Sequence, residues 1–207
     1  MNRVKKIAGA SSFAALAYVM GLAPASIPFP LLPFLRFDLA EIPDLLSFII
    51  FGWKYGLMTA FAHWYGLLIT AQGVFAPPPV PQLMKLTAVL ATFLGVYLGT
   101  RISKRFGKAQ TASATAMAVL TRAGVMAPIT FAVYYLLFPT IYLPFGKRVL
   151  STAGYVVDSD LAVATLITGF TAAFNTLAAL YLVPLCFSIA KALKRALGHR
   201  LVLAEAV

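Results

Sequence analysis

Long apolar stretches alternate with short polar or proline-rich connections along the whole chain. A helix that crosses a bilayer needs roughly 20 apolar residues, and the ten-residue alternation that is typical of transmembrane strands is missing here. Only 11% of the 207 residues are charged and 61% are hydrophobic, so the chain has too little charge to cover a water-soluble surface. We therefore predict an all-α membrane protein that forms one integral membrane domain over residues 1–207.

The apolar stretches predict six transmembrane helices. The first stretch also fits a signal peptide, but the remaining segments make better topological sense if this stretch is retained. The last stretch is too long for one simple crossing, so we expect part of it to form a helical turn outside the membrane. The six helices are expected at about residues 7–27, 42–54, 57–72, 83–102, 111–138 and 161–193.

Basic residues gather in every second connection and near both ends of the chain, together with a single acid, Glu205. The connections at 27–44, 73–82 and 139–160 instead mix both signs of charge. By the positive-inside rule, both termini face the cytoplasm of a multi-pass plasma-membrane protein. The formal charge of +11 also raises nucleic-acid binding, but no glycine-rich loop or base-stacking motif accompanies these residues, so contact with membrane lipid is expected. The basic residues on the predicted cytoplasmic side are Arg3, Lys5, Lys6, Lys54, Arg101, Lys104, Arg105, Lys108, Lys191, Lys194, Arg195 and Arg200.

The sequence offers little for catalysis, cofactors or metals. It has no Walker A loop, its single cysteine, Cys186, excludes an internal disulfide, and no cluster of His, Cys and carboxylate residues indicates a metal site. An intramembrane enzyme needs a nucleophile with a base, paired acids or metal ligands, and the acids at 38–44 are the only cluster that could serve. We expect a protein that is not an enzyme, with an intramembrane enzyme or a structural subunit of a membrane complex as alternatives.

Three of the six acidic residues, Asp38, Glu41 and Asp44, lie directly against a hydrophobic run. An ionised carboxylate in hydrocarbon costs several kcal/mol, so these acids need partners or water. They are candidates to accept hydrogen bonds from substrate hydroxyls. Acids also favour the N-terminus of a helix, and for Asp44 we prefer a capping or dipole role on the second helix.

Polar side chains inside the apolar segments are the other binding candidates. Asn175 is able to read the edge of a flat heterocycle with its two donors and one acceptor, or to join two helices. Arg122 needs an acidic partner or a substrate group, or it snorkels to the surface. Lys85 is placed to close the site or to contact headgroups. Aromatic residues such as Tyr134 offer stacking surface or belong to the interfacial belt.

Several motifs resemble the substrate-binding S components of energy-coupling factor (ECF) vitamin transporters. The passage from Phe37 to Gly56 is similar to the family's "hydrophobic–Asp–x–x–x–Ile–Pro … Phe–Gly–x–x–x–Gly" pattern. Three further segments resemble riboflavin-specific members in the same order: Gln82-Leu83-Met84-Lys85, Arg122-Ala123-Gly124-Val125-Met126 and Phe174-Asn175.

The resemblance implies a membrane subunit that captures a vitamin from outside and assembles with a transmembrane coupling subunit and two cytoplasmic ATPases. It also implies that small residues on the first helix contact the coupling subunit, and Ala10 and Ala14 fit that pattern. The alternative is that these small residues pack against other helices of the same molecule. Riboflavin is the first expected substrate. Another vitamin is the alternative, because Ala178 stands where riboflavin-specific members usually carry lysine, and their Asn-Tyr pair late in the fifth helix is missing.

Overall fold

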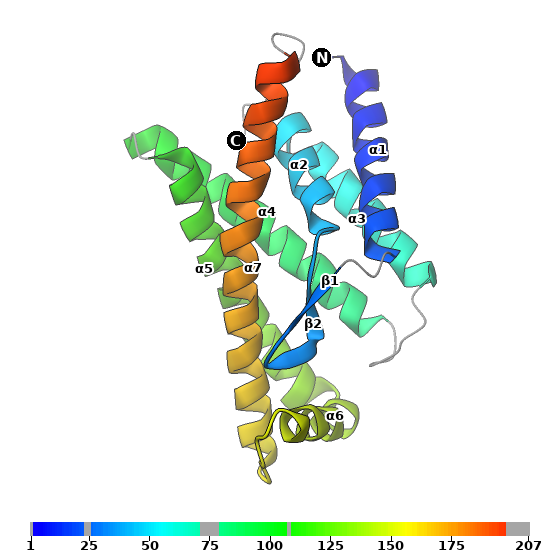
Figure 1. Cartoon of the computed structure of the whole chain (residues 1–207), viewed down its shortest axis with the longest axis vertical. Helices are drawn as coiled ribbons and strands as arrows, with labels where there is room; N and C mark the ends of the chain where they lie inside the picture. The colour runs from blue at the N-terminus through cyan, green and yellow to red at the C-terminus, as the bar shows by residue number, and fades with distance from the viewer. Residues whose placement is uncertain (1, 23–25, 71–78, 107–108, 198–207) are drawn as a thin grey trace.

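The computed structural model describes residues 2–22, 26–70, 79–106 and 109–197. Most of these residues are helical, and one short β-hairpin lies between α1 and α2 in the chain (Figure 1). The start of α1 and the end of α7 lie at the same end of the molecule, together with the turn between α2 and α3 (Figure 1). Seven of the 17 basic residues, at the start of α1, at the α2–α3 turn and at the end of α7, are therefore gathered at one end.

Three shorter helices form one side of the bundle: α1 (Arg3–Leu22), α2 (Glu41–Phe51) and α3 (Trp53–Thr70), which pack on one another. Gly52 separates α2 from α3 with a φ of 98°, a conformation that favours glycine because it has no Cβ. The first helix was predicted at about residues 7–27. The observed helix α1 starts earlier, at Arg3, and residues 26–27 belong to a strand.

Three longer helices form the other side: α4 (Val80–Phe106), α5 (Gln110–Phe131) and α7 (Asp160–Leu197). At Gly99 the α4 backbone lies so close to α5 that an added Cβ would come within 2.3 Å of the Ser113 carbonyl oxygen. Glycine thus permits the close approach of the two helices. A π-helical turn, η1 (Ala132–Leu137), continues α5 shortly after Pro128, which lacks the N–H for a regular helical bond.

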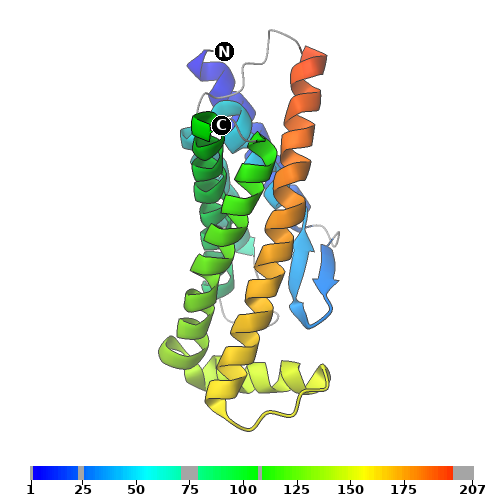
Figure 2. The same cartoon turned by 90° about the vertical axis from the view of Figure 1, so that its left-hand side faces the viewer.

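The connections hold more structure than the sequence predicts. Residues 27–44 were expected to be a loop, but β1 (Ser26–Phe29) and β2 (Leu32–Asp38) form an antiparallel hairpin that pairs Ser26 with Asp38. The predicted loop at 139–160 contains α6 (Pro139–Thr152), which lies across the end of the long helices (Figure 2). Proline at the first helical position suits this start because its missing N–H needs no partner there. The proline-rich connection at 73–82 lies mostly outside the described residues.

The last predicted segment forms one continuous helix, α7, of 38 residues, and the expected helical turn outside the membrane stays a prediction. At a rise of 1.5 Å per residue α7 is about 57 Å long, well beyond the roughly 30 Å of a bilayer core. Among the described residues, three helical stretches are long and apolar enough to cross a membrane: Val80–Arg105, Gln110–Leu137 and Asp160–Leu197. The six predicted crossings and the orientation of the termini stay predictions.

Candidate substrate-binding site

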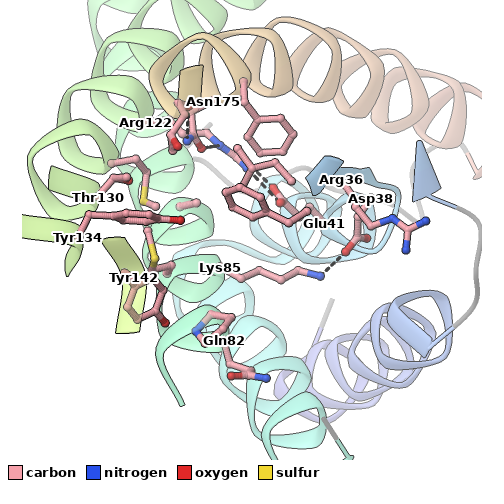
Figure 3. A pocket seen from close by; sticks show the side chains of 18 of the residues that line it. Arg36, Asp38, Glu41, Gln82, Lys85, Arg122, Thr130, Tyr134, Tyr142 and Asn175 are labelled. Carbon is pink, nitrogen blue, oxygen red and sulfur yellow. Dashed lines mark hydrogen bonds and ion pairs between the residues drawn. The ribbon is translucent and has the colours of Figure 1, made fainter. Parts of the chain in front are cut away.

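A cavity of about 380 Å³ opens between the hairpin, the start of α4, the second half of α5, α6 and α7. This volume is within the range of roughly 300–1,000 Å³ that small-molecule sites occupy. All six residues predicted to bind substrate line this cavity, although they come from six different elements (Figure 3). These residues are Asp38, Glu41, Lys85, Arg122, Tyr134 and Asn175.

Arg122 of α5 forms the centre of a polar network at the wall of the cavity. Its two terminal nitrogens donate to the two carboxylate oxygens of Glu41, at 2.5 and 3.0 Å. Arg122 is only 1% exposed. A buried cation of this kind requires a paired anion with good geometry, and the two-point contact supplies it. Arg122 therefore has an acidic partner, as expected for one of its predicted roles, and its side chain does not extend to the membrane surface.

Asn175 of α7 joins the same network. Its Oδ1 accepts a hydrogen bond from Nε of Arg122 at 2.9 Å, and its Nδ2 donates to the carbonyl oxygen of Thr171 at 2.8 Å. Thr92 of α4 accepts a further bond from Arg122 at 3.2 Å. The network thus ties α2, α4, α5 and α7 together. Asn175 makes the interhelical bond that was the alternative to ligand contact, and its bond to Thr171 uses one of its two amide hydrogens.

A second ion pair lies on the cavity wall. Lys85 near the start of α4 donates to Oδ2 of Asp38 at the end of β2. The side chains are 25% and 21% exposed, so this pair is wetter than the Arg122–Glu41 pair. The other carboxylate oxygen of Asp38 accepts a bond from the Ala40 backbone N–H at 2.5 Å, which fixes the chain where the hairpin enters α2.

Aromatic side chains supply most of the apolar lining. Tyr134 and Tyr142 pack edge to face with ring centroids 5.1 Å apart, a favourable arrangement for aromatic pairs. Phe34 and Phe145 make a similar contact at 5.1 Å on the same lining. The cavity thus combines flat apolar surfaces with a few polar groups, as small-molecule sites usually do.

Three further polar lining residues, Gln82, Thr130 and Tyr142, were not among the six predicted binding residues. Each carries a buried side-chain oxygen without a hydrogen-bond partner among the described residues. Gln82 belongs to one of the segments that resemble riboflavin-specific members, and Thr130 lies where those members carry an Asn-Tyr pair. The sequence does not tell which way either side chain points. That direction becomes visible only in the folded chain.

Asp44 was expected to cap the second helix or to interact with its dipole. It is buried, and its Oδ2 lies 2.7 Å from Nδ1 of His63 on α3, so the two residues join α2 to α3. Asp44 does lie in the first turn of α2, yet no side chain caps that helix. A narrow void of about 10 Å³ next to this pair is also lined by Trp64, Gln82 and Lys85.

Of the two alanines predicted to contact a coupling subunit, Ala10 is fully buried and its carbonyl oxygen accepts a bond from Thr59 of α3 at 3.2 Å. Ala14 is half-buried. Ala10 thus packs within the molecule and does not face a partner. Of the two alanines, Ala14 is the one with surface that a coupling subunit is able to contact. Among the described residues, no group of three His, Cys, Asp or Glu side chains is arranged to hold a metal ion.

Comparison with known proteins rests on the fold. No family model matches the sequence, and no curated protein matches it. A solved structure of the S component of a bacterial ECF transporter matches with a TM-score of 0.70 at 18% sequence identity. The match covers 96% of this chain and 100% of that chain. The chain therefore has the fold of an ECF transporter S component.

Proposed function

We propose that this protein is the substrate-binding S component of an ECF-type importer in the plasma membrane. In this role it captures a small micronutrient and does not catalyse a reaction. A transmembrane coupling subunit and two cytoplasmic ATPase subunits supply the energy for uptake. The shared fold supports the class of protein, and the cavity supports the binding role.

The single observation that carries this proposal is the arrangement of the cavity. Polar and charged side chains from seven elements, far apart in the sequence, line one space of about 380 Å³. A core that served only stability would be filled by apolar side chains, because interiors are close-packed and buried charges are costly. Ligand sites, by contrast, keep a few oriented polar groups in an apolar space.

Riboflavin is the first candidate substrate. The motifs around Gln82, Arg122 and Asn175 favour it, and aromatic walls together with the remaining amide hydrogen of Asn175 suit a flat heterocycle with donors and acceptors along its edge. The polar rim formed by Asp38 and Lys85 suits a hydroxylated chain. Another vitamin is the alternative, because Ala178 replaces the lysine of riboflavin-specific members.

The test is purification in mild detergent, followed by absorbance and fluorescence of the bound fraction and titration with riboflavin. A nanomolar ligand present at micromolar concentration raises stability by several kcal/mol, which a thermal-shift assay detects. We expect such a shift with riboflavin, or with one of thiamine, biotin, folate and pantothenate. If none of these compounds changes the melting temperature, the protein is not a vitamin-binding subunit.

A further inference from the structure

Two buried hydroxyl groups on the cavity wall lack a partner in the protein. Thr130 is 1% exposed and Tyr142 is 5% exposed, and the side-chain oxygens of both make no hydrogen bond with the described residues. Both residues line the cavity. Buried polar groups are nearly always hydrogen-bonded, because leaving them unpaired is unfavourable. Two unpaired hydroxyls on one cavity wall therefore indicate groups that a ligand satisfies.

Thr130 differs from Thr92 and Thr115, two other buried threonines of the bundle. The hydroxyls of Thr92 and Thr115 donate to the carbonyl four residues earlier in their own helices, each at 2.8 Å. This bond is the usual solution for a threonine within a helix. The Thr130 hydroxyl does not make it, so it keeps its donor and acceptor capacity for the cavity.

Tyr142 lies on the same side of the cavity as Thr130, next to the ring of Tyr134 (Figure 3). Burial raises the pKa of the Tyr142 phenol, so the group stays a neutral hydroxyl at physiological pH. Tyr134 belongs to the π-helical turn η1, and such turns occur often at functional sites. Together the three residues present flat aromatic surface with neutral hydroxyl groups beside it.

The charges around the cavity are already balanced. Glu41 neutralises Arg122, and Asp38 neutralises Lys85. The remaining charged lining residue, Arg36, is exposed, and its guanidinium points away from the space that the other residues surround (Figure 3). A charged ligand would have to break one of these pairs or enter without a counter-ion, and both are costly in a partly buried site.

We propose that the substrate is an uncharged planar molecule whose polar edge is hydrogen-bonded by the hydroxyls of Thr130 and Tyr142. This inference rests on the proposed function and names the chemistry of its substrate. It also assigns direct recognition to neutral hydroxyls on α5 and α6, whereas the Arg122–Glu41 pair holds the helices that form the wall.

The first experiment compares matched pairs of compounds that differ in charge: riboflavin with riboflavin 5′-phosphate, nicotinamide with nicotinate, and biotin amide with biotin. We expect the uncharged member of the pair that binds to have at least a 30-fold lower Kd by isothermal titration calorimetry. Equal or tighter binding of the charged member overturns this inference and leaves the proposed function standing. Absence of binding by all compounds of this set and of the vitamin screen overturns both.

The second experiment uses the uncharged compound that binds most tightly. We expect Thr130→Val and Tyr142→Phe each to weaken its binding about threefold to tenfold, as the loss of one hydrogen bond does. Without ligand, the melting temperature of each variant stays within about 2 °C of the unmodified protein, because no bond within the protein is lost. The matched controls Thr165→Val and Tyr135→Phe, on exposed positions of α7 and η1, leave affinity unchanged. Unchanged affinity in both Thr130→Val and Tyr142→Phe overturns the assignment.

Discussion

The guanidinium of Arg122 and the carboxylate of Glu41 meet in a two-point ion pair, although they are 81 positions apart in the sequence. Arg122 is 1% exposed and lies in an apolar helix, where an unpaired cation is costly. The pair gives the cation a counter-ion and links the acidic first turn of α2 to α5. The polar wall of the cavity depends on this contact.

We predict that Glu41→Gln lowers the free energy of unfolding by about 3–5 kcal/mol, because it leaves the buried charge of Arg122 without its counter-ion. Chemical denaturation in detergent measures this loss. The matched control is Asp160→Asn, which breaks the exposed pair between Lys147 and Asp160 at 2.7 Å. Asp160→Asn should lower the free energy of unfolding by less than about 1 kcal/mol. Equal effects of the two substitutions would show that the Arg122–Glu41 pair is not specially important for stability.

We predict that Asn175→Ala weakens ligand binding at least tenfold while expression is preserved. The substitution removes an amide on the cavity wall and releases Nε of Arg122 from the bond that orients it. Calorimetry with the ligand found in the vitamin screen measures the change. Leu177→Ala, on the exposed side of the same helix, is the control and should leave affinity unaltered. An unaltered Kd for Asn175→Ala would remove Asn175 from the site.

We predict that Gly99→Ala destabilises the protein by about 1–3 kcal/mol, because the new Cβ would overlap the backbone of α5. Gly124→Ala is the matched control, since nothing lies within 4 Å of its added Cβ. Alanine favours helices over glycine by up to about 1 kcal/mol, so this control should be neutral or stabilising. Thermal unfolding of both variants measures the difference. A stable Gly99→Ala protein would contradict the close packing of α4 on α5.

We predict that Asp44 and His63 are energetically coupled. Removing either partner leaves the other buried without its hydrogen bond, which costs about 1–3 kcal/mol. The measurement is a double-mutant cycle of Asp44→Ala, His63→Ala and the combined variant. We expect the combined loss to fall short of the sum of the single losses by about 1 kcal/mol or more. If the two single losses simply add up in the combined variant, the contact between Asp44 and His63 does not contribute to stability.

The sequence alone is enough to predict a helical membrane protein, because hydrophobic runs and clustered basic residues act locally. It also points to the residues around the cavity, since a charge or an amide within an apolar segment needs a partner wherever it folds. Asp38, Glu41, Arg122 and Asn175 were chosen for this reason, Lys85 for its place at the start of the fourth predicted helix and Tyr134 for its aromatic ring. All six line one cavity. Their contact with a substrate stays a prediction.

Only the tertiary structure decides which partner each of these groups takes. Local rules assign Asp44 to a helix cap, but His63 of the neighbouring helix binds it instead. The hairpin, α6 and the continuous α7 likewise depend on packing between segments that are distant in the sequence. The unpaired hydroxyls of Thr130 and Tyr142 are the clearest case. A hydroxyl's direction follows from helix rotation and neighbouring side chains, and neither is encoded by residue type or spacing.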